Sequence, residues 1–307
     1  MSLISAVRSR LSLKISLTLA VLLLLLTSGA AAIITLKQSQ QMEEMTLEKA
    51  KLAATLGARQ YGDTFDNAID SGLLTVNDVF DRSYVEIKGW AWGEKPKFHT
   101  RFDAFTYRAV LVFQDKYLEN EDFVFAVGVD VNGYLPTHNS KFQQPLTGTA
   151  EKDLAGNRTK RIFNDPVGLA AAKNVESSLL QVYSRDTGEV MWDVSSPVMV
   201  KGKHWGGFRI GVSMERIGAQ KRSLIVTLAA IFAAFAVITI ITIYVVVERA
   251  MRPVVELTAA AESISMGDGL ETAIKPQSTD EIGQLTKAVE RLRVSMKAAM
   301  RDRKSVV

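Results

Sequence analysis

The sequence predicts an α+β membrane protein with two transmembrane helices, an antiparallel sheet domain between them and a parallel helical bundle after the second. Residues 15–36 and 223–247 are apolar runs without an internal charge, and each exceeds the roughly 20 residues that cross a hydrocarbon core. Residues 251–300 carry apolar side chains at intervals of three and four, which is the pattern of helices that pack against one another.

Basic residues at the edges of the apolar runs predict the orientation in the membrane. Five of them flank the two runs on one side: Arg8, Arg10, Lys14, Arg249 and Arg252. Short flanks rich in Lys and Arg stay in the cytoplasm, so both ends should lie inside and the domain between the runs outside. Lys221 and Arg222 oppose this orientation, but they end a long translocated domain, for which the rule counts little.

The predicted boundaries divide the chain into six segments and indicate the inner membrane of a cell as its location. We expect a cytoplasmic N-terminus at 1–14, a transmembrane helix at 15–36, an extracytoplasmic domain at 37–222, a second transmembrane helix at 223–247, a helical domain at 248–300 and a tail at 301–307.

The first apolar run has a second interpretation as a cleavable signal peptide. Its basic start, the apolar residues 20–26 and the small residues 29–32 fit that interpretation. We favour a retained span because the apolar run continues to residue 36, beyond any cleavage site, and is long enough to cross.

Composition argues against several classes of function. The net charge is +4, but the basic residues form no stripe with interleaved aromatics, so nucleic-acid binding is not expected. The absence of cysteine excludes disulfides, thiolate metal sites and c-type haem. His99, His138 and His204 lack any ligand spacing, so we expect no metal and no cofactor. No nucleophile–base arrangement stands out, and we expect no enzyme.

The outer domain should begin with helices. Residues 38–70 contain no proline, and apolar side chains recur there at about 3.6 residues, which predicts a helix continuous with the first span. A short helix is expected at 73–80, an ordered loop at 88–99 and a further helix at 102–118.

The pattern then changes to strands. We expect five strands in one antiparallel sheet, with a long helical insertion after the second strand, packed on the helices. The predicted strands are 123–129, 134–138, 179–183, 189–200 and 204–213, and turns are predicted at 132–133, 186–188 and 201–203.

Three stretches of the outer domain are similar to a known family: VGVDVNGYLPTHN (127–139), GNRTKRIFND (156–165) and LLQVYSRDTGEVMWDVSSPVMVKGKHWGGFRIGV (179–212). Residues 123–213 resemble the extracellular Cache domains of bacterial methyl-accepting chemotaxis proteins. The resemblance implies a PAS-like sheet behind a long N-terminal helix, with a ligand pocket between the sheet and the helices that cover it.

By their positions in this resemblance, six residues are candidates to face the ligand: His138, Asn139, Arg158, Lys160, Arg161 and Tyr183. Such a set suits a carboxylate or another small anion, because Arg binds carboxylates through two parallel hydrogen bonds. Alternatively, the cations are solvated or pair with Asp153, Asp165 and Asp186. The tryptophans Trp192 and Trp205 are expected in the core.

The C-terminal segment predicts two helices with heptad seams. Gly267 and Gly269 should end the first helix, and Ser278 with Glu281 should form a capping box that starts the second. About eleven connecting residues let the chain return along the first helix, so that the second runs parallel to it. The side chains expected to pack in this domain are Pro253, Leu257, Ile264, Leu270, Ile274, Glu281, Ile282, Leu285, Val289 and Leu292.

Two seams in one chain cannot both be buried alone, so we expect a homodimer with a four-helix bundle. The segment resembles a HAMP domain in Arg252-Pro253, Leu257, Gly267-Asp268 and the run Asp280-Glu281-Ile282-Gly283-Gln284-Leu285. The remaining alternative is a two-helix coiled coil without a switching role.

No histidine follows His204, so the tail offers no phosphoacceptor, and it has no phosphate-binding glycine loop. The two resemblances imply a chemosensory receptor subunit that binds a small ligand outside and signals through the HAMP domain to a separate or missing output module. An alternative is a non-catalytic scaffold or decoy that pairs with full-length receptors or kinases. An extracytoplasmic enzyme anchored at both ends is a third interpretation, which nothing in the sequence favours.

Overall fold

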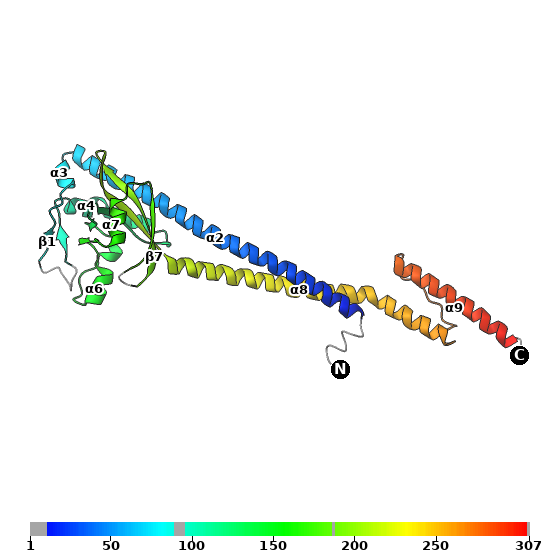
Figure 1. Ribbon diagram of the computed structural model, residues 1–307. Coiled ribbons are helices and arrows are strands. Elements are labelled where there is room, and N and C mark those ends of the chain that lie inside the picture. Colours follow the sequence, from blue (N-terminus) through cyan, green and yellow to red (C-terminus); the bar gives the residue numbers. More distant parts are fainter. Residues whose placement is uncertain (1–10, 89–95, 186–187, 306–307) are drawn as a thin grey trace. The chain divides into compact units, whose positions relative to one another are not determined.

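The computed structural model describes residues 11–88, 96–185 and 188–305 (Figure 1). The chain forms two compact units. One unit is Thr35–Val226, and the other combines the segments on either side of it, up to Ile34 and from Thr227.

Two long helices carry the apolar runs. Helix α2 spans Leu11–Asp70 and helix α8 spans Met214–Ser265. Each contains a stretch that is long and apolar enough to cross a membrane, and that stretch is almost entirely exposed, with 6% of it buried in α2 and none in α8. Both helices are therefore candidates to span a membrane, because a core helix of a water-soluble protein would bury such side chains.

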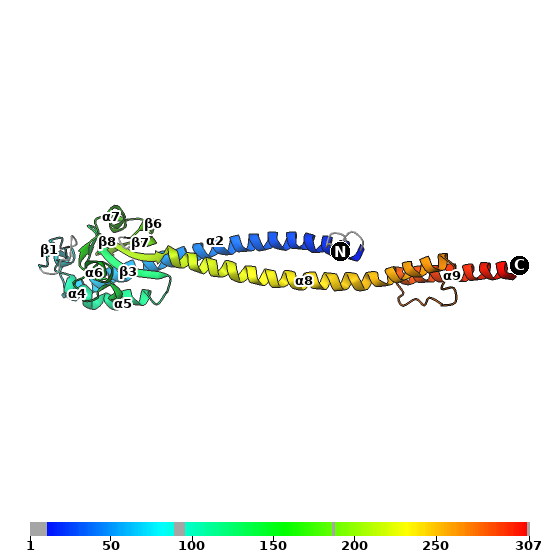
Figure 2. The ribbon, with the colours of Figure 1, turned by 90° about the horizontal axis from the view of Figure 1, so that it is seen from below.

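A four-stranded antiparallel sheet forms the centre of the first unit (Figure 2). Its order is β3 (Phe123–Asp130), β8 (Lys203–Ser213), β7 (Val190–Val200) and β6 (Leu179–Ser184). The predicted turn between the last two strands is confirmed, since Lys201 and Gly202 have φ values of 48° and 73°. Helix α8 begins at Met214, directly after the last residue of β8, so no loop separates the strand from the helix.

The predicted second strand is wrong in extent and in partner. Only Tyr134–Leu135 forms a strand, β4, which pairs with β5 (Arg161–Ile162) in a separate ribbon. Gly133 has a φ of 80°, and the Asp130 carboxylate accepts the N–H of Tyr134 at 2.9 Å, so the turn directs the chain away from the sheet. Pro136 then lacks the N–H that would continue the ladder. The main sheet therefore has four strands, not five.

The remaining elements are short. Helix α3 (Val76–Val79) lies within the predicted helix 73–80, and the predicted helix 102–118 is divided into α4 (Asp103–Ala109) and α5 (Leu111–Tyr117). The segment between β4 and β6 contains a 3-10 turn (Ser140–Phe142) and the helices α6 (Ala150–Gly156) and α7 (Pro166–Lys173). The last small ribbon pairs β1 (Val85–Glu86) with β2 (Phe98–His99). Residues 89–95 of the predicted loop, and 186–187 of one predicted turn, lie outside the described residues.

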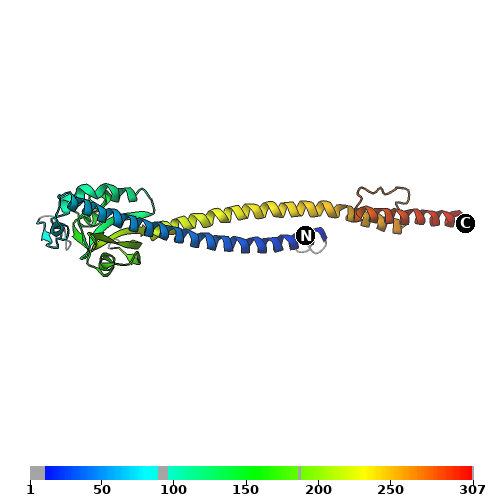
Figure 3. The same ribbon diagram turned by 90° about the horizontal axis from the view of Figure 1, so that it is seen from above.

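Helix α2 lies across one face of the sheet (Figure 3). An aromatic core forms between the helix and that face. Tyr61 of α2 stacks on Trp205 with 5.2 Å between ring centroids, and Phe65 contacts the same indole at 5.0 Å. Gly57 permits this close approach, because a Cβ there would lie 2.1 Å from Cε1 of Phe208. Trp205 is fully buried and Trp192 packs against this core, as predicted.

The second unit contains the C-terminal pair of helices. Helix α8 ends at Ser265, and the left-handed residues Gly267 and Gly269 follow, with φ values of 88° and 71°, as predicted. Helix α9 spans Glu281–Ser305. A Cβ at Gly267 would lie 2.7 Å from Cε of Met300, so the end of the first helix lies beside the end of the second, and the two run parallel.

The predicted capping box of α9 is wrong. Asp280, not Ser278, is the capping residue: its Oδ1 accepts the N–H groups of Ile282 at 3.0 Å and Gly283 at 3.1 Å. The Ser278 hydroxyl donates to the same oxygen. The box would need the helix to start two residues earlier, whereas Glu281 is its first residue.

Candidate ligand-binding site

A cavity of about 380 Å³ lies on the face of the sheet opposite α2. The edge strand β3 and the central strand β8 form its floor through Phe125, Val127 and Arg209. The ribbon of β4 and β5, the start of α7 and the other edge strand, β6, surround it. This volume falls in the range of sites for small molecules.

Four of the six predicted ligand residues line this cavity: His138, Arg158, Arg161 and Tyr183. The other two lie elsewhere. The buried Asn139 accepts the N–H of Ala126 through Oδ1 at 2.9 Å and thereby holds strand β3. The ammonium of Lys160 pairs with Asp103 at 2.6 Å. These two residues therefore support the structure around the cavity and do not line it.

The sequence analysis missed two arginines of the cavity, Arg185 and Arg209. The sequence of strand β8 does contain a pattern that indicates Arg209. Phe208 and Ile210 face the aromatic core, and Arg209 between them faces the other side of the sheet. A charged residue on a buried strand face indicates a polar site. For Arg185 no comparable pattern exists, because it follows the last residue of β6.

Arg209 is held by a buried ion pair. Its Nε lies 3.1 Å from both carboxylate oxygens of Asp193, and its Nη2 lies 2.8 Å from Oδ2. Burial raises the pKa of the Asp193 carboxyl, and the guanidinium of Arg209 opposes that shift. The pair fixes one guanidinium at the floor of the cavity, from two neighbouring central strands.

The other guanidiniums lie over aromatic rings. The Arg158 and Arg161 guanidinium carbons are 5.5 Å and 4.8 Å from the centroid of Phe163. The Arg185 guanidinium lies 5.1 Å from the centroid of Phe142 and pairs with Glu189 at 2.8 Å. Such stacking orients the planar guanidinium groups at the wall of the cavity.

His138 contributes a neutral donor. Its Nδ1 accepts the N–H of Asn139 at 2.8 Å. Burial lowers the pKa of His138 well below its usual value, and the charges of Arg158 and Arg185 lower it further. The neutral imidazole therefore carries its proton on Nε2, which is left to donate.

Among the residues that the structure describes, the carboxylate of Asp165 lines the cavity, and it caps a helix. Asp165 Oδ1 accepts the N–H groups of Val167 at 3.1 Å and Gly168 at 3.0 Å at the start of α7. Asp153 likewise accepts the backbone N–H groups of Thr147 and Gly148. The cavity thus brings together four guanidiniums, a neutral imidazole and a tyrosine hydroxyl, a set dominated by hydrogen-bond donors.

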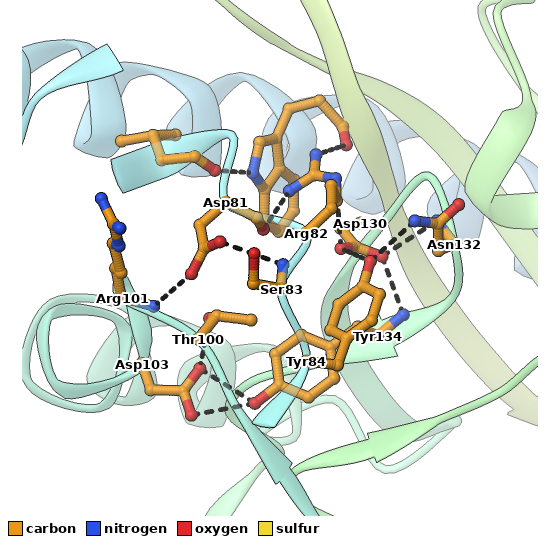
Figure 4. Close-up of polar contacts among 12 residues, drawn as sticks. Asp81, Arg82, Ser83, Tyr84, Thr100, Arg101, Asp103, Asp130, Asn132 and Tyr134 are labelled. Carbon is orange, nitrogen blue, oxygen red and sulfur yellow. Dashed lines mark hydrogen bonds and ion pairs between the residues drawn. The ribbon is translucent and has the colours of Figure 1, made fainter. Parts of the chain in front are cut away.

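A second polar cluster lies outside this cavity, between the residues 81–84 and 100–103 on one side and strands β3 and β4 on the other (Figure 4). The buried carboxylate of Asp130 accepts the hydroxyl of Tyr84 at 2.6 Å and pairs with Arg82 at 3.4 Å. Asp103 accepts the hydroxyl of Tyr134 at 2.9 Å. These carboxylates accept hydrogen bonds from several neighbouring elements, so the cluster anchors residues 81–84 and 100–103 next to the sheet.

The predicted packing residues of the C-terminal helices fall into two groups. Leu257 and Ile264 are buried within the single chain, and another five are partly buried: Pro253, Leu270, Ile274, Ile282 and Val289. Glu281 is exposed. Leu285 and Leu292 are also exposed, at 45% and 54%, although they occupy heptad positions. One face of α9 therefore packs on its own chain and another apolar face is uncovered.

Polar contacts fix the connector between these helices. Glu290 of α9 accepts the N–H of Ile274 at 2.9 Å and pairs with Arg293 at 2.7 Å. Arg293 also donates to the carbonyl of Leu270. The hydrogen bonds from Arg293 and Ile274 lower the pKa of Glu290 to about 2.

Residues 245–298 match the HAMP domain family, so the resemblance of this segment is confirmed. A comparison of the chain with curated proteins found no match. A HAMP domain after a candidate membrane helix, with a sheet domain between two such helices, fits a sensor–HAMP receptor. The domain points to transmembrane signal transduction and suggests a receptor that is not an enzyme. Among the described residues, no group of three His, Asp or Glu side chains is placed to hold a metal.

Proposed function

We propose that the chain is a subunit of a chemotaxis-type transmembrane receptor whose Cache-like domain binds a small anion outside the cell. The observation that carries the proposal is the donor-rich cavity: Arg158, Arg161, Arg185 and Arg209 surround it together with the neutral His138. A carboxylate accepts two parallel hydrogen bonds from one guanidinium, and a water-poor site strengthens that contact.

The proposed orientation places residues 37–222 outside the inner membrane and both chain ends in the cytoplasm. The support is the distribution of basic residues next to the apolar runs, with Arg249 and Arg252 directly after the second run. A ligand from the surroundings then reaches the cavity without crossing the membrane.

Signal transfer is proposed to start at strand β8. Arg209 lies on this strand at the floor of the cavity, and the strand continues without a loop into α8. An anion that draws the guanidinium toward itself shifts β8 and displaces α8 along its axis. Shifts of about 1–2 Å between packed helices are sufficient in known switches. The HAMP domain passes the change to an output module on a separate protein or on a segment outside this chain.

The receptor is proposed to act as a homodimer. The exposed Leu285 and Leu292 of α9 support this, because two copies of the helix pair bury these side chains in a four-helix bundle. Exposed Met45, Leu52 and Leu56 on α2 provide a second apolar stripe for the same pairing in the outer domain.

A binding experiment on the full chain in detergent tests the proposal. Acetate, succinate and citrate are screened by thermal shift, and we expect at least one to raise the melting temperature. Arg158→Gln should weaken that acid by about tenfold or more, because a charge-assisted hydrogen bond contributes roughly 1.5–3 kcal/mol.

The matched control is Arg101→Gln, because the side chain of Arg101 is 68% exposed and lies outside the cavity. This variant should bind the acid as the wild type does. If no small anion shifts the melting temperature, or if both variants lose affinity equally, the cavity is not the anion site.

A further inference from the structure

Lys97 is a buried cation close to the proposed ligand site, and its side chain is fully enclosed. Its Nζ donates three hydrogen bonds: to the carbonyl of Asn157 at 2.9 Å, to Oδ1 of the same residue at 2.5 Å and to the carbonyl of Thr159 at 2.6 Å. Three neutral acceptors thus match the three N–H groups of an ammonium.

The charges around Lys97 are mostly positive. None of its hydrogen-bond partners among the described residues is a carboxylate. Burial, followed by the charges of Arg161 and Arg158, lowers the pKa of Lys97 to about 7. Lys160 lowers it further, and Asp153 on α6 raises it.

The buried His138 also faces the charge of Lys97, which contributes to lowering the pKa of His138. Three further titratable groups among the described residues lie in or beside the ribbon of β1 and β2. Glu86, Lys88 and His99 are all exposed there, so water screens them. The protonation of Lys97 therefore depends first on its burial, then on the charges of the neighbouring segment and on any charge that enters the cavity beside them.

The segment that Lys97 holds supplies two arginines to the cavity. Asn157 and Thr159 flank Arg158, and Arg161 follows two residues later. The same segment is tied by backbone bonds, from Arg158 to the carbonyl of Phe142 at 2.8 Å and from Phe98 to the carbonyl of Lys160 at 2.8 Å. Lys97 is thus a positioning residue for the cationic wall of the site.

We infer that protonation of Lys97 and binding of an anion in the cavity are coupled, so that the receptor binds its ligand with proton uptake. The inference rests on the proposed anion site. The ammonium satisfies all three acceptors and holds Arg158 in place, whereas the neutral amine has only two N–H groups. A bound anion offsets the repulsion between the buried cations and therefore favours the ammonium.

The sign of the pH dependence follows from this coupling. The anion prefers the protonated form, so binding transfers a proton from the buffer to Nζ of Lys97. As pH rises from 6 to 8, the proton is lost in the free protein and the affinity falls. One coupled proton changes the affinity by at most about tenfold per pH unit, so we expect a decrease of several-fold over this range.

Calorimetry of the full chain in nanodiscs tests the inference. Acetate, succinate and citrate are each titrated at pH 6, 7 and 8 in two buffers with different ionisation enthalpies. For the acid that binds, the heat should differ between the buffers at pH 7 in the sense of proton uptake by the protein, and binding should weaken toward pH 8.

Two variants and one control separate coupling from a structural role. Lys97→Arg keeps a permanent charge and should lose both the proton uptake and the pH dependence. Lys97→Met should bind weakly at every pH. Lys152→Met removes an exposed lysine of α6 and should behave as the wild type. If Lys97→Met does not fold, the comparison of the wild type with Lys97→Arg still tests whether Lys97 takes up the proton.

The outcomes are distinct for the two proposals. An acid that binds without proton uptake and with equal affinity from pH 6 to 8 overturns the coupling but leaves the anion site intact. Proton uptake that persists in Lys97→Arg assigns the proton to another group, such as His138, and also overturns the inference. If none of the three acids binds at any pH, the site and the coupling fall together.

Discussion

At the scale of single residues, the site is built from arginines whose positions are fixed by burial and by specific partners. Asp193 and Arg209 illustrate this, because both side chains are nearly inaccessible and they satisfy one another through three contacts. Removal of one partner from a buried pair leaves an uncompensated charge, which costs more than the pair itself contributes.

We therefore expect Asp193→Asn to lower the free energy of unfolding by about 3–5 kcal/mol. Denaturant unfolding of the full chain in detergent, followed by the fluorescence of the tryptophans, measures this loss. Asp70→Asn is the control, because Asp70 pairs with Lys201 at 2.6 Å but its side chain is 67% exposed, and such pairs contribute about 1 kcal/mol or less. Equal losses in the two variants would contradict the structural role of the buried pair.

At the scale of elements, the sequence patterns correctly predicted the helices and strands that have the same environment along their whole length. The helical period of 38–70 and the hairpin from β7 to β8 were predicted because one face of each packs on the same core throughout. Strand β4 was overestimated because its pairing depends on how Asp130 and Gly133 form the turn. Propensity over a few residues does not contain that information.

The candidate site shows the same limit. His138, Arg158 and Arg161 were found because their motifs resemble those of Cache domains, and Arg209 was missed although it lies in a predicted strand. Which face of a strand borders a cavity depends on what covers that face, and this is decided by the fold of distant segments. The role of Lys97 depends in the same way on contacts 60 and 62 residues away in the sequence.

Helix α9 offers a prediction at the same scale. A Cβ at Gly283 would lie 1.9 Å from the carbonyl oxygen of Ser278, so the connector passes directly over this helical glycine. Gly283→Ala should force the connector away and destabilise the HAMP domain by about 1–3 kcal/mol.

Thermal unfolding followed by circular dichroism measures the effect of Gly283→Ala. Gly218→Ala is the matched control, because Gly218 also lies in a helix and a Cβ there meets nothing within 4 Å. That variant should be neutral or stabilising by up to about 1 kcal/mol. A stable Gly283→Ala variant would show that the connector does not need this close approach.

At the scale of the whole molecule, the proposed dimer can be tested by cysteine crosslinking. The chain has no cysteine, so one introduced cysteine reports a single position. Under mild oxidation in membranes, Leu285→Cys should form a covalent dimer quickly, because this exposed leucine is expected in the core of the bundle.

Lys287→Cys provides the comparison, since Lys287 is also exposed on α9 but outside the heptad seam. Its crosslinking should be several-fold slower, and gel electrophoresis of samples taken over time measures both rates. A ligand that changes the packing should alter the rate at Leu285→Cys. Equal rates at the two positions would argue against the bundle, and crosslinks to a different chain would favour the scaffold or decoy function.

The direct passage from Ser213 to Met214 has a consequence for the resting receptor. In the proposed receptor, a strand that joins a helix without a loop transmits movements of the empty sheet domain to the helix, as well as the proposed displacement by a ligand. The basal output is then set by how rigid the empty domain is, and substitutions that soften its core change the unstimulated signal even when they leave the cavity untouched. The proposal therefore predicts that the level of signal without a ligand depends on the stiffness of strand β8.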